Sequence, residues 1–181
     1  MRKIICLLLL LGICLCSITA LTSCEESADT GISKEEWDAL NDPELYKNFT
    51  AKTTVTESSS KIVTEQRVVD GIVYTTSTSY ALETDEVLSS TPWEISDFSI
   101  ALLLPEYDSV KYDKEAGVYR HTEASSDSLP EIIREYTITD GKVSSTDSEM
   151  WQDIASLGAV KITVHAEYSN YGTTVAPEIN E

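Results

Sequence analysis

The chain has no cysteine after residue 24. Its four cysteines all fall within the first 24 residues, at Cys6, Cys14, Cys16 and Cys24. If the segment before Cys24 is removed and Cys24 itself is modified, the domain that follows contains no thiol. This excludes disulfide bonds, thiolate metal ligands and a cysteine nucleophile in that domain.

Histidine is almost as scarce, and recognisable catalytic motifs are missing. The two histidines, His121 and His165, are expected in the middle of strands on a polar face, without a clustered partner that would make a metal ligand or a general base. The sequence has no Gly-x-Ser-x-Gly motif, no calcium-binding loop and no phosphate-binding glycine loop. We therefore expect no catalytic residue, no metal, no cofactor and no enzymatic activity.

Basic residues are few, with 13 Lys and Arg against 31 Asp and Glu and a net charge of −18. Removing Arg2 and Lys3 with the N-terminal segment leaves 11 basic against 31 acidic residues, a net charge of about −20. Such an acidic chain is a poor partner for nucleic acid or for an anionic lipid surface. Its charge is typical of a domain that stays soluble beside a negatively charged envelope.

The first 24 residues are the most informative part of the chain. Arg2 and Lys3 precede an apolar run over residues 4–16, and small residues follow before Cys24. This order is typical of a secretory signal peptide. An uncleaved signal anchor is an alternative, although the apolar run is shorter than the ~20 residues that a membrane span usually needs.

The end of this segment, Leu21-Thr22-Ser23-Cys24, resembles the bacterial lipobox. The resemblance implies that Cys24 is the lipidation site and the mature N-terminus, and that the protein is anchored on the extracytoplasmic face of the cell membrane. Ordinary cleavage without lipid is a further alternative. We expect residues 1–23 to be the signal peptide, residues 24–31 an acidic tether and residues 32–181 a single domain, as a monomer.

Helix signals occur twice in that domain. Ser33 and Glu36 form a capping-box pattern, which predicts a short helix from Lys34 to about Asn41, and Pro43 can restart a turn through Tyr46. Thr91-Pro92-Trp93-Glu94 combines an N-cap threonine with proline at the first helical position, which predicts a second, apolar helix to about Leu104.

Strand signals fill most of the remaining domain. Alternation of apolar and polar residues predicts strands over 49–56, 62–69, 72–82, 110–113, 118–122, 132–139, 142–143 and 160–168. Asp70-Gly71 and Asp140-Gly141 are hairpin-turn signals. Residues 150–157 are ambiguous, because Trp151, Ile154 and Leu157 could also form a helical turn packed on the sheet.

The order of these elements, the two Asp-Gly turns and the Tyr171-Gly172-Thr173 ending resemble the lipoprotein-carrier superfamily of LolA, LppX and LprG. The resemblance implies an α+β fold: a strongly curved antiparallel half-barrel packed against one apolar helix and a short N-terminal helix. It also implies an apolar ligand cavity, whose candidate lining residues are Tyr74, Tyr80, Trp93, Phe98, Leu102, Tyr136, Ile162 and Val164. The alternative is that these side chains close on each other as an ordinary core.

Three function classes follow from this sequence. The first is a membrane-anchored carrier or sensor of a lipid or other apolar ligand. The second is an anchored module that contacts envelope proteins or cell-wall polymer without a ligand cavity. The third is an unrecognised hydrolase, for which no motif argues.

Overall fold

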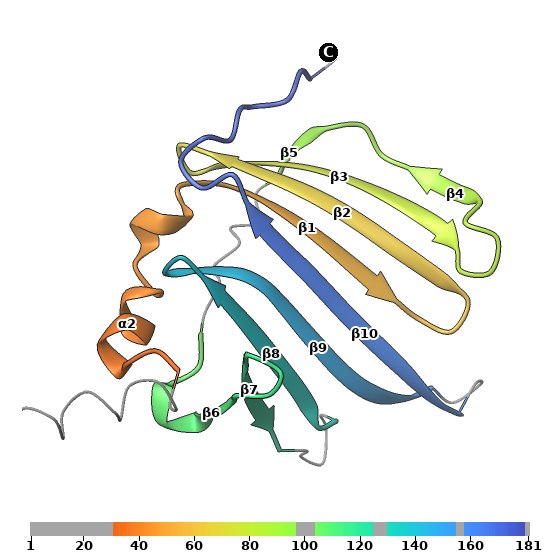
Figure 1. The fold of residues 1–181 in the computed structure, drawn as a ribbon. Helices are drawn as coiled ribbons and strands as arrows, with labels where there is room; N and C mark the ends of the chain where they lie inside the picture. Colours follow the sequence, from red (N-terminus) through yellow and green to blue (C-terminus); the bar gives the residue numbers. More distant parts are fainter. Residues whose placement is uncertain (1–30, 97–103, 125–129, 155–157, 180–181) are drawn as a thin grey trace, which may run out of the picture. The chain divides into compact units, whose positions relative to one another are not determined.

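The computed structural model describes residues 31–96, 104–124, 130–154 and 158–179. Residues Lys34–Glu181 form one compact unit. The main feature of this unit is a single ten-stranded sheet in the order β4-β3-β2-β1-β10-β9-β8-β7-β6, with β5 also paired to β3 (Figure 1).

All strand pairs described are antiparallel. The first half of the sheet contains β1 (Asn48–Thr56), β2 (Ser60–Val69), β3 (Ile72–Ala81), β4 (Val87–Ser90) and β5 (Glu94–Ser96). The second half contains β6 (Val110–Asp113), β7 (Val118–Glu123), β8 (Ile132–Thr139), β9 (Lys142–Ile154) and β10 (Gly158–Ser169). The pairing of β1 with β10 joins the two halves into one sheet.

The two Asp-Gly hairpins are confirmed. Asp70 and Gly71 have φ values of 53° and 81°, and Asp140 and Gly141 have 52° and 67°. Two successive positive φ values are required by a type I′ turn, which matches the twist of the flanking strands. Each turn therefore sets the register of the strand residues next to it, although the β8–β9 register shifts between Thr137 and Ile138.

The expected α+β half-barrel is wrong. The sheet is open, because among the described strands β6 pairs with neither β4 nor β5. It is also not strongly curled (Figure 1). In the described part of the chain the only α-helix is α2 (Lys34–Ala39), which the sequence predicted, and the turn at Pro43–Tyr46 is the 3-10 segment η1. No helix in these described ranges is both long and apolar enough to cross a membrane.

The second helix does not begin at Thr91 as expected. Glu94–Ser96 is instead β5, which pairs with β3 through Ile95 and Tyr74. The Thr91 hydroxyl accepts a hydrogen bond from the Ser77 amide of β3 at 3.0 Å, so it is not used as a helix cap. Cross-strand pairing has overridden the local capping signal at this point; residues 97–103 lie outside the described ranges.

The described part of the ambiguous segment, residues 150–154, is strand rather than helical turn, and Leu157 lies outside the described residues. Met150 pairs with Ile162, and Trp151 pairs with Lys161, as β9 continues to Ile154. Trp151 is 55% exposed, so it does not pack on the sheet as the helical alternative required.

The aromatic core begins at Trp37 of α2, which is fully buried. Its ring centroid lies 5.1 Å from that of Tyr119 on β7 and 5.8 Å from that of Tyr136 on β8. The indole Nε1 donates a hydrogen bond to the Pro105 carbonyl at 2.9 Å. The helix is thus fastened both to the sheet and to the segment that leads into β6.

A second cluster surrounds Phe49 of β1, with Ala51, Val68 and Val73 buried beside it. The Tyr171 ring stacks on Phe49 at 5.9 Å, and its hydroxyl donates to the Val143 carbonyl at 2.8 Å.

We call the sheet face that carries Phe49, Tyr119 and Tyr136 the core face. The opposite face, which carries Lys52, Lys61 and Tyr80, is the outer face.

Candidate functional site

The structure describes six of the eight candidate cavity residues and distributes them over opposite faces of the sheet. Register places Tyr80 of β3 opposite Lys61, and Lys61 opposite Thr56 of β1, all on the outer face. Tyr74 lies on the same face, and the Trp93 ring packs there against Arg67. Because successive side chains of a strand point to opposite faces, Ile162 and Val164 lie on the core face with Tyr136.

The six of these side chains that the structure describes therefore cannot line a single cavity. Tyr136 is only 3% exposed and contacts Trp37, which makes it part of the ordinary core. Ile162 and Val164 are half-buried. Phe98 and Leu102 lie outside the described residues.

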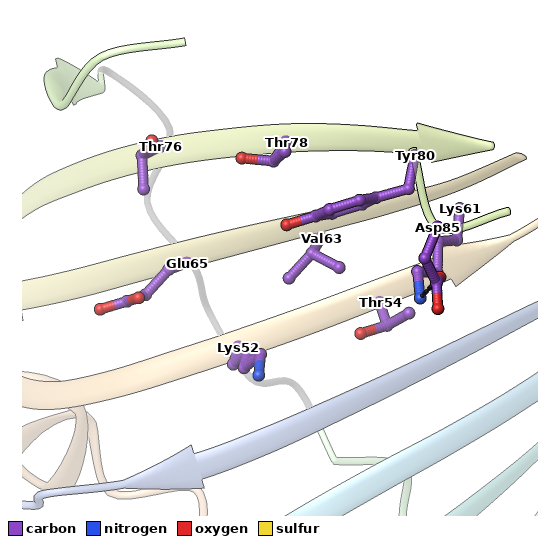
Figure 2. A pocket seen from close by; sticks show the side chains of 9 residues that line it. All are labelled: Lys52, Thr54, Lys61, Val63, Glu65, Thr76, Thr78, Tyr80 and Asp85. Atoms are coloured by element: carbon purple, nitrogen blue, oxygen red, sulfur yellow. Dashed lines mark hydrogen bonds and ion pairs between the residues drawn. The ribbon is translucent and has the colours of Figure 1, made fainter. Parts of the chain in front are cut away.

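The outer face carries an open groove across β1, β2 and β3 (Figure 2). Its volume is about 540 Å³. It is lined by Lys52, Thr54, Lys61, Val63, Glu65, Thr76, Thr78, Tyr80 and Asp85. Of the six candidate cavity residues within the described ranges, only Tyr80 lines it. We call this surface the Tyr80 groove.

One end of the Tyr80 groove is an aromatic and ionic cluster. The Lys61 ammonium lies 5.3 Å from the centre of the Tyr80 ring and 2.5 Å from the Asp85 carboxylate. Figure 2 shows the Tyr80 ring extended over the groove, with Lys61 and Asp85 near the backbone end of the Tyr80 side chain. The ion pair and the cation–π contact together hold one long side chain in place beside the ring.

The middle of the Tyr80 groove carries polar and charged groups around Val63, and its charges alternate. Lys52 is exposed and lies opposite Glu65 of β2 on one side and opposite Glu167 of β10 on the other. The Thr76 hydroxyl donates to the Thr91 carbonyl at 2.6 Å, which leaves its oxygen able to accept a further bond. The groove therefore offers ammonium donors, carboxylate acceptors and hydroxyl groups within one surface.

A second groove of about 320 Å³ continues the Tyr80 groove, since the two share Glu65. It is lined by Thr50, Glu65, Arg67, Asn170, Thr173, Thr174 and Val175. Arg67 bonds Glu65 at 2.9 Å, and its guanidinium lies 4.8 Å from the Trp93 ring. A paired cation thus recurs at this end, with an aromatic ring packed against it outside the groove lining.

The β7–β10 half of the outer face carries a row of ionic pairs. Arg120 contacts Glu135 at 2.6 Å, and His165 contacts Asp147 at 2.7 Å, in neighbouring register positions. These groups line a groove of about 470 Å³. His165 lies on the outer face as predicted, but His121 shares the face of Tyr119 and contacts the Ser109 carbonyl at 3.1 Å.

The hydrogen bond to Asp147 raises the pKa of His165 above its ordinary value of 6.5, against the opposing effect of burial. Because the folded-state pKa is raised, the stabilisation that this pair contributes is fully present below pH 6.5 and is lost as the pH rises through the folded value. We expect Asp147→Asn to lower the pKa of His165, as measured by proton NMR titration.

Glu167 provides the control for that titration. It lies 3.6 Å from His165 Nε2, farther than Asp147 lies from Nδ1. Glu167→Gln should therefore change the pKa less than Asp147→Asn does. An equal change in both variants would contradict the assignment of the shift to the Asp147 hydrogen bond.

Within the described ranges, no group of three or more His, Cys, Asp or Glu residues is placed to hold a metal ion. Comparison with protein-family models, with curated proteins and with solved structures gives no match.

Sequence reasoning missed most of the Tyr80 groove, although one signal was available. The Asp70-Gly71 turn pairs Val69 with Ile72, and counting outward from that pair places Tyr80 opposite Lys61. The same count places Thr76 opposite Glu65. Asp85, which follows β3 in a turn with φ 56°, had no comparable signal.

Proposed function

We propose that this chain is a lipid-anchored extracytoplasmic binding module, which uses the outer face of its sheet to hold a polymer of the cell envelope. The N-terminal signal and Cys24 support the location. The observation that supports the binding role is the Tyr80 groove, which lies open on the sheet and is lined mainly by hydroxyl and charged groups. An extended polar ligand can lie across such a surface without being enclosed.

The arrangement of charges in the groove favours binding over catalysis. Lys61 is paired with Asp85, and Arg67 is paired with Glu65. Groups paired in this way are positioned to donate and accept hydrogen bonds. We therefore propose a non-enzymatic role.

Co-sedimentation tests this proposal. The full-length protein, extracted in detergent, is mixed with protein-free cell wall from a bacterial host and centrifuged. We expect the protein to pellet with the wall. In the same detergent without cell wall, we expect it to remain in the supernatant. Recovery of all the protein in the supernatant at micromolar concentrations would contradict the proposed function.

A second candidate, carriage of an apolar ligand, is supported by the core face away from Trp37 and Phe49. The strand register places two rows of aliphatic side chains side by side on this face. One row is Ile62, Val55 and Val164. The other row is Ile162, Met150 and Ile132. Ile62 is 39% exposed. Native mass spectrometry of the detergent-extracted protein distinguishes this candidate, since a carrier would retain a lipid besides its covalent anchor.

A further inference from the structure

The two connected grooves on β1–β3 suggest which class of polymer is bound. We infer that the ligand is a neutral, linear glycan that lies along β2, from Tyr80 at one end to Arg67 at the other. This inference rests on the proposed function, because it identifies the ligand class of the same surface.

Continuity of the surface supports a linear ligand. The Tyr80 groove and the second groove share Glu65, so they form one track on the outer face. Lys61 and Arg67, near its two ends, are six positions apart on β2. At about 3.3 Å per residue the track is roughly 20 Å long, which suits several linked sugar units better than a single small molecule.

An aromatic ring that lines one end of the track supports a sugar, and a second ring adjoins the other end. Tyr80 lines one end. Trp93 is not among the residues that line the second groove, but its ring packs against Arg67, which lines it. Sugar rings present an apolar face of C–H groups, which an aromatic ring can cover, while their hydroxyls project sideways to polar groups. Tyrosine and tryptophan provide such contact area with little loss of conformational entropy.

The hydroxyl chemistry of the track also fits a glycan. A sugar hydroxyl both donates and accepts hydrogen bonds, so it needs partners of both kinds. Lys52 supplies donors, Glu65 supplies acceptors, and the hydroxyls of Thr54 and Thr78 can supply either. These groups are interspersed along the track instead of being separated by type.

Charge balance favours a neutral glycan over an anionic polymer. Three cations, Lys52, Lys61 and Arg67, lie on the track. Lys61 is bonded to Asp85 and Arg67 to Glu65. Lys52 lies opposite the same Glu65 and opposite Glu167 in register, so three carboxylates face the three cations. This surface therefore has no excess of positive charge that would attract an anionic polymer. The chain as a whole carries a net charge of −18, which would repel one.

Titration of the full-length protein in detergent with defined oligosaccharides tests the inference. The probes are chitohexaose and cellohexaose as neutral glycans, their disaccharides as short forms, and polygalacturonate as an anionic polymer. We expect at least one hexasaccharide to bind, its disaccharide to bind more weakly, and polygalacturonate to bind more weakly than the hexasaccharide at equal sugar concentration.

Substitution of Tyr80 locates the binding. Tyr80→Ala should weaken hexasaccharide binding roughly tenfold or more, whereas Tyr80→Phe should retain most of it, since the ring is kept. Trp151→Ala is the matched control, because Trp151 is an exposed aromatic residue on the outer face of β9, away from the track. Urea unfolding of each variant checks that the fold is retained.

The possible failures are distinguishable. If the protein pellets with cell wall but binds neither hexasaccharide, or prefers polygalacturonate, the glycan inference is overturned and the proposed function stands. If Tyr80→Ala and Trp151→Ala weaken binding equally, the position of the track is overturned. If the protein does not pellet with the wall at all, the proposed function itself fails.

Discussion

Replacement of Trp37 by alanine should lower the free energy of unfolding by about 3–5 kcal/mol, the range typical of a large aromatic side chain removed from a core. Trp37 is fully buried and contacts the rings of Tyr119 and Tyr136. It is also the buried residue of the single α-helix in the described part of the chain. Such a loss is a large share of the roughly 5–15 kcal/mol that stabilises an ordinary domain.

Urea unfolding followed by circular dichroism measures this effect. Trp151→Ala serves as the control, since Trp151 is 55% exposed and its removal should change the stability by no more than about 0.5 kcal/mol. Trp37→Phe should lie between the two, because it keeps a ring but loses the hydrogen bond to the Pro105 carbonyl. Equal stability of Trp37→Ala and Trp151→Ala would show that α2 is not part of the cooperative core.

Substitution of Cys24 by alanine should have the largest effect on location. A diacylglyceryl group supplies two acyl chains, and each buried CH₂ contributes about 0.8 kcal/mol to membrane attachment. Without the thiol no such group can be attached. We expect Cys24→Ala to abolish lipid attachment, so that intact-mass analysis finds the signal peptide retained or the processed protein released into the soluble fraction.

The native protein provides the comparison for this variant. Its mass should correspond to a chain that begins at Cys24 and carries added acyl groups. A native protein of full-length mass that remains in the membrane would support the uncleaved anchor instead. A native mass equal to the unmodified chain from residue 24 would contradict lipidation.

The features that the sequence predicted correctly are those with short-range causes. The Asp70-Gly71 and Asp140-Gly141 turns need only the left-handed backbone conformations of their own residues. Alternation in β10 also carries over, because Val160 and Ala166 are buried while Lys161 and Glu167 are exposed. These patterns depend on neighbouring residues along the chain.

The features that it predicted wrongly depend on contacts between distant residues. Thr91 has good helix-capping chemistry, but its hydroxyl and backbone are bonded to β3. The expected curvature was also wrong, since the bend of a sheet depends on the strand pairing and on irregularities such as the register shift at Ser79 and Tyr80. Local patterns do not contain this information.

The candidate cavity was predicted from the resemblance to the carrier superfamily and from apolar character, without the register between strands. Tyr80 and Val164 each belong to a strongly patterned strand, yet they lie on opposite faces once β1 is placed between β2 and β10. The pairing of β2 with β3 follows from the Asp70-Gly71 turn. The pairing of β1 with β10 joins residues more than 100 positions apart and has no signal in the sequence.

Lysine footprinting tests most directly whether the Tyr80 groove is the surface that meets the envelope. The detergent-extracted protein is acetylated with acetic anhydride in the presence and absence of protein-free cell wall, and each lysine is quantified by mass spectrometry. Lys111 and Lys161 lie elsewhere on the outer face and serve as internal controls. We predict that the wall protects Lys52 and Lys61 and leaves Lys111 and Lys161 unchanged, whereas equal protection of all four, or protection of the control pair alone, would contradict the account.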